Sequence, residues 1–275
     1  MSAYELQKGT EIISPSGTIM INVRDKRGLR KLFIIAIAFI IMLQTCFLPI
    51  AYSALFTMPE KFIYDLTWTG IKAGTASLEL RKDGEKVKIF STAQSAPWIS
   101  VFYTVNDQVE STLLKKNPEN FVQPLQYRLK IREGRHRRDK EIIFDCDNSK
   151  ATYIDRLKNE RKDFQIAPPV LDPLSGFYYI RSLKLAPGQS VYVTIFDSKK
   201  VWNIEVQVLK KEKIILPVGT INTVVVKPLM KSEGIFSRKG EIFIWLTDDE
   251  KHIPVKMQTK VAIGSITATL IEGLY

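Results

Sequence analysis

Acidic side chains are the residues of this sequence that could most directly do chemistry. Asp107, Glu110 and Asp172 occur singly, whereas residues 248–252 gather three carboxylates and an imidazole. Such a set could hold Ca²⁺ or a transition metal, and convergent carboxylates could support hydrolysis. The alternatives are structural: a polar turn between two apolar strands at 248–252, and a helix cap at Asp172. We favour the structural interpretation of both.

Signatures of the common enzyme classes are missing from the sequence. It has no nucleophile elbow, no dinucleotide-binding glycine motif and no phosphate loop. Its two histidines, His136 and His252, lack the spacing of metal ligands. Cys146 stands between Asp145 and Asp147, whose negative charges disfavour a reactive thiolate. We therefore expect no enzymatic activity, no cofactor and no metal ion.

Large aromatic side chains gather at a few places in the sequence. Three of them follow Pro97 within six residues, and residues 241–246 are apolar on both faces of a predicted strand. Such side chains either fill a core or line an apolar pocket. We predict a lipid-binding cavity lined by Trp98, Phe102, Tyr103, Phe177 and Trp245.

Basic side chains are densest at a predicted hairpin tip, where Arg135, Arg137 and Arg138 surround His136. Bases near a membrane surface attract anionic lipid headgroups, each contributing about 1 kcal/mol. The alternative is a solvated tip that is kept charged to prevent pairing between sheet edges. In the functional hypothesis these three arginines bind lipid phosphates or an anionic membrane surface.

The N-terminal part of the chain reads as an export signal. Five bases at 24–31 precede an apolar run that begins at residue 32, and no further charge appears before Glu60. A basic segment, an apolar segment and small residues before Ala54 are typical of a secretory signal cut near Ser53. The alternative is an uncleaved anchor, because residues 32–54 are long enough to span a bilayer.

Both interpretations divide the chain into residues 1–53 and an exported part, residues 54–275, which is periplasmic in either case. Met20 is an alternative start. The net charge of +11 favours anionic neighbours, which at a membrane are lipid headgroups, while nucleic acid belongs to the wrong compartment. Only one cysteine, Cys146, lies beyond residue 53, so no internal disulfide is expected there.

From residue 62 onward the apolar residues recur with period two. Segments 75–81, 126–132 and 201–209 alternate apolar and polar residues, as half-buried strands do. Asp83 and Gly84 supply the turn of a two-residue hairpin. Roughly a dozen strands at hairpin spacing predict a mainly β fold, either an antiparallel β-sandwich or an open half-barrel.

One segment, 168–183, has the pattern of a short helix. Asp172 is suited to cap it and Pro173 to begin it. Gly176 in its interior indicates either close approach of another backbone or a frayed helix. The double proline makes 166–185 the candidate seam between two sheets.

Arg181 on this predicted helix has two candidate partners, Asp107 and Glu110. A pair with either carboxylate would join the helix to the N-terminal strands and lock the fold.

Four sequence blocks resemble, in the right order, a bacterial family catalogued as domain of unknown function 3108. They lie at 64–74, 103–111, 172–181 and 239–255, and the match covers nearly all of residues 62–275. Gly176 replaces the alanine expected in the third block. The resemblance implies an exported, mostly β protein without an established activity. In outline the chain also resembles LolA-type periplasmic lipoprotein carriers, half-barrels that shelter acyl chains.

The sequence therefore supports two functional hypotheses. The first is a non-catalytic binding module for a lipid or a lipoprotein, in which a curved sheet takes the acyl chain. The second is a structural or protein-interaction component of the cell envelope. The first is favoured by the export signal, the positive charge and the strands that are apolar on both faces.

Overall fold

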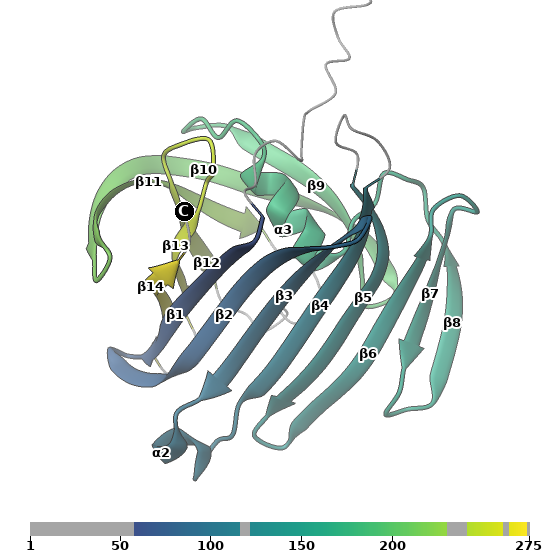
Figure 1. Cartoon of the computed structure of the whole chain (residues 1–275), viewed down its shortest axis with the longest axis horizontal. Helices are drawn as coiled ribbons and strands as arrows, with labels where there is room; N and C mark the ends of the chain where they lie inside the picture. The colour runs from purple at the N-terminus through teal and green to yellow at the C-terminus, as the bar shows by residue number, and fades with distance from the viewer. Residues whose placement is uncertain (1–57, 116–121, 230–240, 261–263, 274–275) are drawn as a thin grey trace, which may run out of the picture. The chain divides into compact units, whose positions relative to one another are not determined.

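The alternating pattern folds into one antiparallel sheet of 14 strands (Figure 1). The computed structural model describes residues 58–115, 122–229, 241–260 and 264–273. The first eight strands are β1 (Glu60–Trp68), β2 (Ile71–Asp83), β3 (Lys86–Ser95), β4 (Asn106–Lys115), β5 (Val122–Glu133), β6 (His136–Asp145), β7 (Lys150–Asp155) and β8 (Glu160–Gln165). The other six are β9 (Ser190–Asp197), β10 (Lys200–Leu216), β11 (Gly219–Leu229), β12 (Ile242–Thr247), β13 (Pro254–Lys260) and β14 (Ser265–Gly273).

The sheet consists of two meanders, β1–β8 and β9–β14. Pairing of β1 with β14 joins them, so that β8 and β9 form the two edges of a single sheet. The fold is therefore the open alternative of the sequence prediction, and the two-sheet sandwich is wrong. Two helices accompany the sheet in the described residues where one was expected: α2 (Pro97–Ser100) and α3 (Pro173–Arg181).

Residues 1–57 lie outside the part of the chain that the structure describes, and with them the predicted signal or anchor at 32–54 and the cut near Ser53. Among the described residues, no helix is both long enough and apolar enough to cross a membrane. All the described residues belong to one unit, Pro49–Tyr275. The candidate seam at 166–185 falls on the connection between the two meanders.

The hairpin of β2 and β3 shows how local sequence sets the register. Leu78 and Leu80 are buried on one face of β2, as the alternation predicts. Asp83 pairs with Lys86, and Gly84 between them has a φ of +61° that suits glycine. The predicted two-residue hairpin is confirmed, but its turn residues are Gly84 and Glu85, because Asp83 is still paired in the strand.

Helix α3 begins at a capped residue, as predicted. Asp172 Oδ1 accepts hydrogen bonds from the backbone N–H groups of Leu174 and Ser175, at 2.9 and 3.0 Å. The Ser111 hydroxyl on β4 donates to Asp172 Oδ2 at 2.6 Å, which fixes the start of the helix to the sheet. Complete burial raises the pKa of Asp172, while these hydrogen bonds partly oppose the shift.

The interior glycine of α3 marks a close approach of β9. A Cβ atom on Gly176 would lie 2.9 Å from Cγ2 of Ile195. The neighbour is a side chain and, among the described residues, no other backbone lies against this glycine, so the predicted close approach of a backbone is wrong, while the tight contact explains why a residue without Cβ stands here.

Arg181 ends the helix in a fully buried ion pair, but its partner differs from the sequence prediction. Its guanidinium binds the Glu60 carboxylate through two hydrogen bonds of 2.8 and 2.9 Å. The Tyr178 hydroxyl donates to the same carboxylate at 3.0 Å. Asp107 and Glu110, the predicted partners, lie elsewhere, because only the pairing of β1 into the sheet brings Glu60 to this place. The pair does connect the helix to an N-terminal strand.

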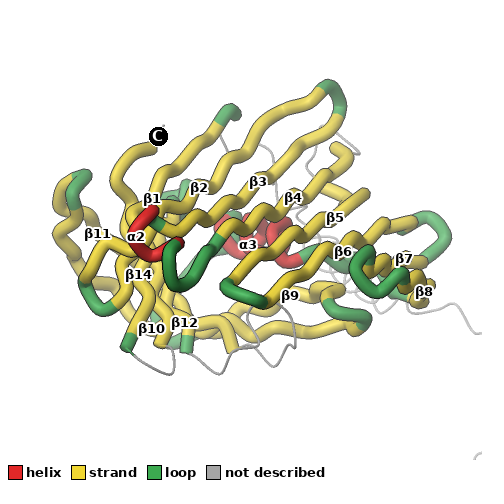
Figure 2. The backbone as a smooth tube through the Cα atoms, turned by 90° about the horizontal axis from the view of Figure 1, so that it is seen from below, coloured by secondary structure: helices red, strands yellow, loops and turns green. Residues whose placement is uncertain are grey.

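Side chains bring the two edges of the sheet together. Phe196 on β9 packs against Phe144 and Phe164, and Lys199 pairs with Glu160 on β8. The backbone of Leu171, just before α3, bonds to β9. The sheet thus curves around α3, which lies on its concave side (Figures 1 and 2).

Candidate functional site

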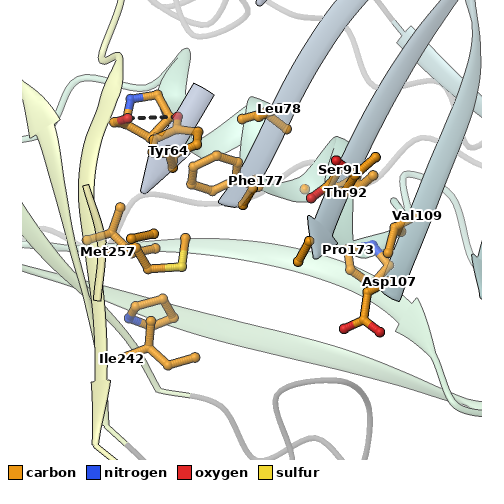
Figure 3. A pocket seen from close by; sticks show the side chains of 18 of the residues that line it. Tyr64, Leu78, Ser91, Thr92, Asp107, Val109, Pro173, Phe177, Ile242 and Met257 are labelled. Atoms are coloured by element: carbon orange, nitrogen blue, oxygen red, sulfur yellow. Dashed lines mark hydrogen bonds between the residues drawn. The ribbon is translucent and has the colours of Figure 1, made fainter. Parts of the chain in front are cut away.

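A cavity of about 390 Å³ lies between α3 and the concave face of the sheet (Figure 3). This volume is within the range of roughly 300–1,000 Å³ that is usual for small-molecule sites. Both meanders and the helix contribute side chains to its wall. The site therefore depends on the β1–β14 pairing that joins the meanders.

Apolar side chains make up most of the wall. The helix supplies Leu174, Phe177 and Ile180, and β9 and β12 supply branched aliphatic residues. The facing strands carry small residues, which leave the space open: Ala76, Ala93 and Ala268. At one end Tyr64 closes the pocket, its hydroxyl donating to the Pro254 carbonyl at 2.8 Å. The interior is thus shaped to hold an apolar group.

Charged side chains are confined mainly to the opposite end, formed by β4, β5 and β6. Asp107, Glu133 and Arg138 line the pocket there. Arg138 Nε donates to His136 Nε2 at 2.7 Å, which holds the guanidinium beside the turn of the β5–β6 hairpin. An arginine at the polar end of an apolar pocket is suited to bind a carboxylate or phosphate.

Asp107 is one of the titratable groups of this polar end. Its Oδ1 accepts the backbone N–H of Arg132 at 3.0 Å. Burial raises the pKa of Asp107 to about 6, and the negative charge of Glu133 adds to the shift. The Arg132 N–H and the positive charge of Arg138 partly oppose it. The charge at this end of the pocket therefore changes near pH 6.

The structure brings two of the eight residues predicted from the sequence into the pocket wall, Phe177 and Arg138. Trp98, Phe102 and Tyr103 lie outside the wall, in and just after α2, and Phe102 is 85% exposed. Their alternative role as core filler does not hold either, because all three are exposed.

Trp245 is buried, but on the other face of β12. Ile244 lines the pocket, and the alternation along a strand turns Trp245 away from it. The indole N–H donates to Glu212 on β10 at 2.6 Å, and the ring packs in an apolar cluster with Val225 and Val255. Both faces of β12 are apolar, and the face that carries Trp245 is therefore covered by other parts of the protein.

Arg135 and Arg137 are exposed at the tip of the β5–β6 hairpin, outside the pocket wall. Arg137 donates to the backbone carbonyls of Gly134 and His136, at 2.6 and 2.8 Å. Of the three predicted arginines, Arg138 thus lines the pocket, whereas Arg135 and Arg137 lie on the surface.

The acidic residues considered for chemistry do not converge. Asp172 is the buried helix cap, Glu110 pairs with Lys88 on the outer face of the sheet, and only Asp107 lines the pocket. In the 248–252 turn, Asp249 Oδ1 accepts the backbone N–H groups of Lys251 and His252. Within the described ranges no group of three potential ligands is placed to hold a metal ion.

Several lining residues carry no signal that would single them out in the sequence. Ala93, Ile195 and Met257 look like ordinary strand residues, and Glu133 like a turn residue. For Arg138 a signal existed, because it lies opposite Ile131 across a two-residue turn and so shares its buried face.

Comparisons with known proteins place the chain in a family. The family model described as "Protein of unknown function (DUF3108)" matches residues 63–271. The chain belongs to the DUF3108 family. The resemblance seen in the four sequence blocks is confirmed. A search of curated proteins finds no significant match for this DUF3108 protein.

Two solved structures are similar to this DUF3108 protein. One is a β-barrel-like protein of domain of unknown function DUF1849 from Brucella abortus, with 14% identity and a TM-score of 0.48, covering 78% of this chain and 96% of that one. The other is a putative exported protein with a YmcC-like fold from Bacteroides fragilis, with 10% identity and a TM-score of 0.31, covering 80% and 97% of the two chains.

Proposed function

We propose that this DUF3108 protein is a non-catalytic binding module for a lipid or acylated ligand. The observation that carries the proposal is the cavity of about 390 Å³, whose wall is mainly apolar with most of its charged residues at one end. In this proposal one hydrocarbon chain occupies the space beside α3. The anionic group at its head meets Arg138.

The energetics favour a hydrocarbon guest over a polar one. Each methylene transferred from water into an apolar cavity contributes about 0.8 kcal/mol. A polar group placed beside Leu174, Phe177 and Ile180 would lose its hydrogen bonds with water and find few partners. An elongated apolar ligand with a single polar end therefore matches the distribution of side chains.

Native mass spectrometry of the full chain, purified from a membrane-containing extract, tests the proposal. A co-purified species with the mass of one lipid or fatty acid is expected, and its fragmentation identifies the headgroup. Repeated preparations with a clean apo mass would contradict the proposal. A stoichiometric envelope protein in place of lipid would instead favour the structural or interaction role.

Arg138→Gln is expected to weaken binding of a long-chain fatty acid by about tenfold or more, because a charge-assisted hydrogen bond is lost. The corresponding fatty alcohol should bind the variant and the original protein alike. Titration calorimetry on delipidated protein measures both affinities. The matched control is Arg137→Gln, whose side chain is exposed one residue away. An equal loss of fatty acid affinity in the two variants would contradict a role for Arg138 in binding the headgroup.

Binding of an anionic ligand is expected to depend on pH through Asp107. Above pH 6 its carboxylate is ionised and repels the headgroup, whereas below pH 6 it is neutral, so affinity should rise by about fivefold as the pH falls from 8 to 5. An alkyl sulfonate is the suitable probe, because its own charge is constant over this range. Asp107→Asn should abolish the dependence. A dependence that persists in this variant would assign it to another group, such as His136.

The proposal places the described domain in the periplasm. Export would follow from the basic and apolar segments before residue 54, with the domain either released near Ser53 or held at the inner membrane by residues 32–54.

A further inference from the structure

One end of the sheet carries an unusual set of exposed apolar side chains. Two flank the β1–β2 turn, four belong to α2 and the turn after it, and one lies on β14. We call this set the aromatic rim: Trp68, Ile71, Trp98, Val101, Phe102, Tyr103 and Ile266. Phe102, Val101 and Ile71 are 85%, 78% and 60% exposed.

Short contacts make the rim one continuous surface. The Trp98 indole N–H donates to the Lys72 carbonyl beside Ile71, at 3.2 Å. Backbone bonds join Thr69 to Ser265, next to Ile266, and Gly134 to Thr104. The Tyr103 ring lies against Gly134, so that the aromatic rim reaches the β5–β6 hairpin.

Positive charge borders the rim. Lys72, Arg132, Arg135 and Arg137 are exposed on the β2 and β5–β6 segments that flank α2. Asp65 pairs with Lys72 and offsets its charge, so the excess positive charge of the border comes from the three arginines, while Asp107 and Glu133 line the pocket. The rim thus combines apolar tips with a basic border.

The geometry points to an anionic lipid bilayer as the partner of the aromatic rim. Aromatic side chains are enriched at the interface of a bilayer, and flanking basic side chains attract its anionic headgroups. The exposed side chains stand on a four-residue helix, the turn after it and the ends of β1, β2 and β14, so they can enter the headgroup layer without opening any strand pairing. We propose that the protein docks on the membrane through this rim.

The pocket reaches the same end of the sheet. Its lining residues Leu66, Asp107 and Glu133 are within two residues of Trp68, Val105 and Gly134. Docking would therefore bring the charged end of the pocket to the bilayer surface. An acyl chain could then move between bilayer and pocket without crossing bulk water.

Tryptophan fluorescence of the full chain tests the docking directly. All four tryptophans lie beyond residue 57, at 68, 98, 202 and 245, so the signal reports on the described domain even where residues 32–54 insert. The protein is reconstituted with vesicles of phosphatidylglycerol and phosphatidylethanolamine whose chains are brominated. Bromine at shallow depth should quench the fluorescence, and the double variant Trp68→Phe, Trp98→Phe, which removes both tryptophans of the rim, should lose most of the quenching. Trp202→Phe, the control, should leave the quenching in place.

The basic border has its own expected result. The double variant Arg135→Gln, Arg137→Gln should lose most of the difference in quenching between phosphatidylglycerol vesicles and uncharged phosphatidylcholine vesicles. Arg161→Gln with Lys162→Gln, two exposed bases on β8, should retain it.

The outcomes separate docking from occupation of the pocket. Ala93→Phe, which fills the pocket, should leave the quenching of Trp98 unchanged, even if no lipid binds inside. Quenching that the Trp68→Phe, Trp98→Phe variant does not reduce, or that Trp202→Phe reduces as much, would overturn the docking proposal. Absence of quenching would overturn it as well and leave the rim as a surface for a protein partner.

Discussion

Replacing Glu60 by Gln is expected to lower the free energy of unfolding by about 3–5 kcal/mol, the cost of breaking a buried ion pair. The Arg181 guanidinium is fully buried and loses the carboxylate that accepts two of its hydrogen bonds. Tyr178, which donates to the same carboxylate, loses its charged acceptor too. Urea unfolding followed by tryptophan fluorescence measures the change.

Glu79→Gln is the matched control for this variant. Glu79 pairs with Arg81 at 3.6 Å, but both side chains are solvated, so the change should stay below about 1 kcal/mol. A double variant, Glu60→Gln with Arg181→Met, should cost less than the sum of the two single changes, because no unpaired charge remains. If Glu60→Gln costs no more than Glu79→Gln, the pair does not hold the helix in place.

The fold was largely predictable because its main signal is local. Alternation of apolar and polar residues indicates which side of a strand faces the core. This alternation predicted the segments that form β2, β5 and β10. The helix and its N-terminal cap were equally predictable from Asp172 and Pro173. By contrast β8, with the sequence Glu-Arg-Lys-Asp-Phe-Gln, is a charged edge strand in which only one residue is apolar, so it leaves no alternating pattern.

The site was less predictable because it depends on pairing between distant segments. Arg181 and Glu60 are 121 residues apart, and their contact follows from the position of β1 next to β14. The local sequence did not predict that Phe102 would be exposed either, because large apolar residues after a proline more often lie in a core. Trp245 was ambiguous because both faces of its strand are apolar, and only the distant Glu212 shows which face it takes.

Ala93→Phe is expected to abolish the co-purified lipid and to weaken fatty acid binding by at least about tenfold. Ala93 lies on the concave face between Ala76 and Asp107, where its methyl group leaves the pocket open. A phenyl ring at this position would occupy the space that the hydrocarbon chain needs. The variant should fold, because an apolar side chain placed in an apolar hollow gains contacts instead of losing them. Native mass spectrometry and calorimetry measure the two effects.

Gln94→Phe separates blockage of the pocket from any general effect of an added ring. Gln94 is the next residue on the same strand, and its side chain is exposed on the convex face. It should therefore keep both the lipid and the affinity, while thermal unfolding of the two variants stays close to that of the original protein. If both variants bind alike, the ligand does not lie beside Ala93, and the apolar hollow between α3 and the sheet is not the binding site. Loss in Ala93→Phe alone would place the hydrocarbon chain between the helix and β3, where the small side chains leave room for it.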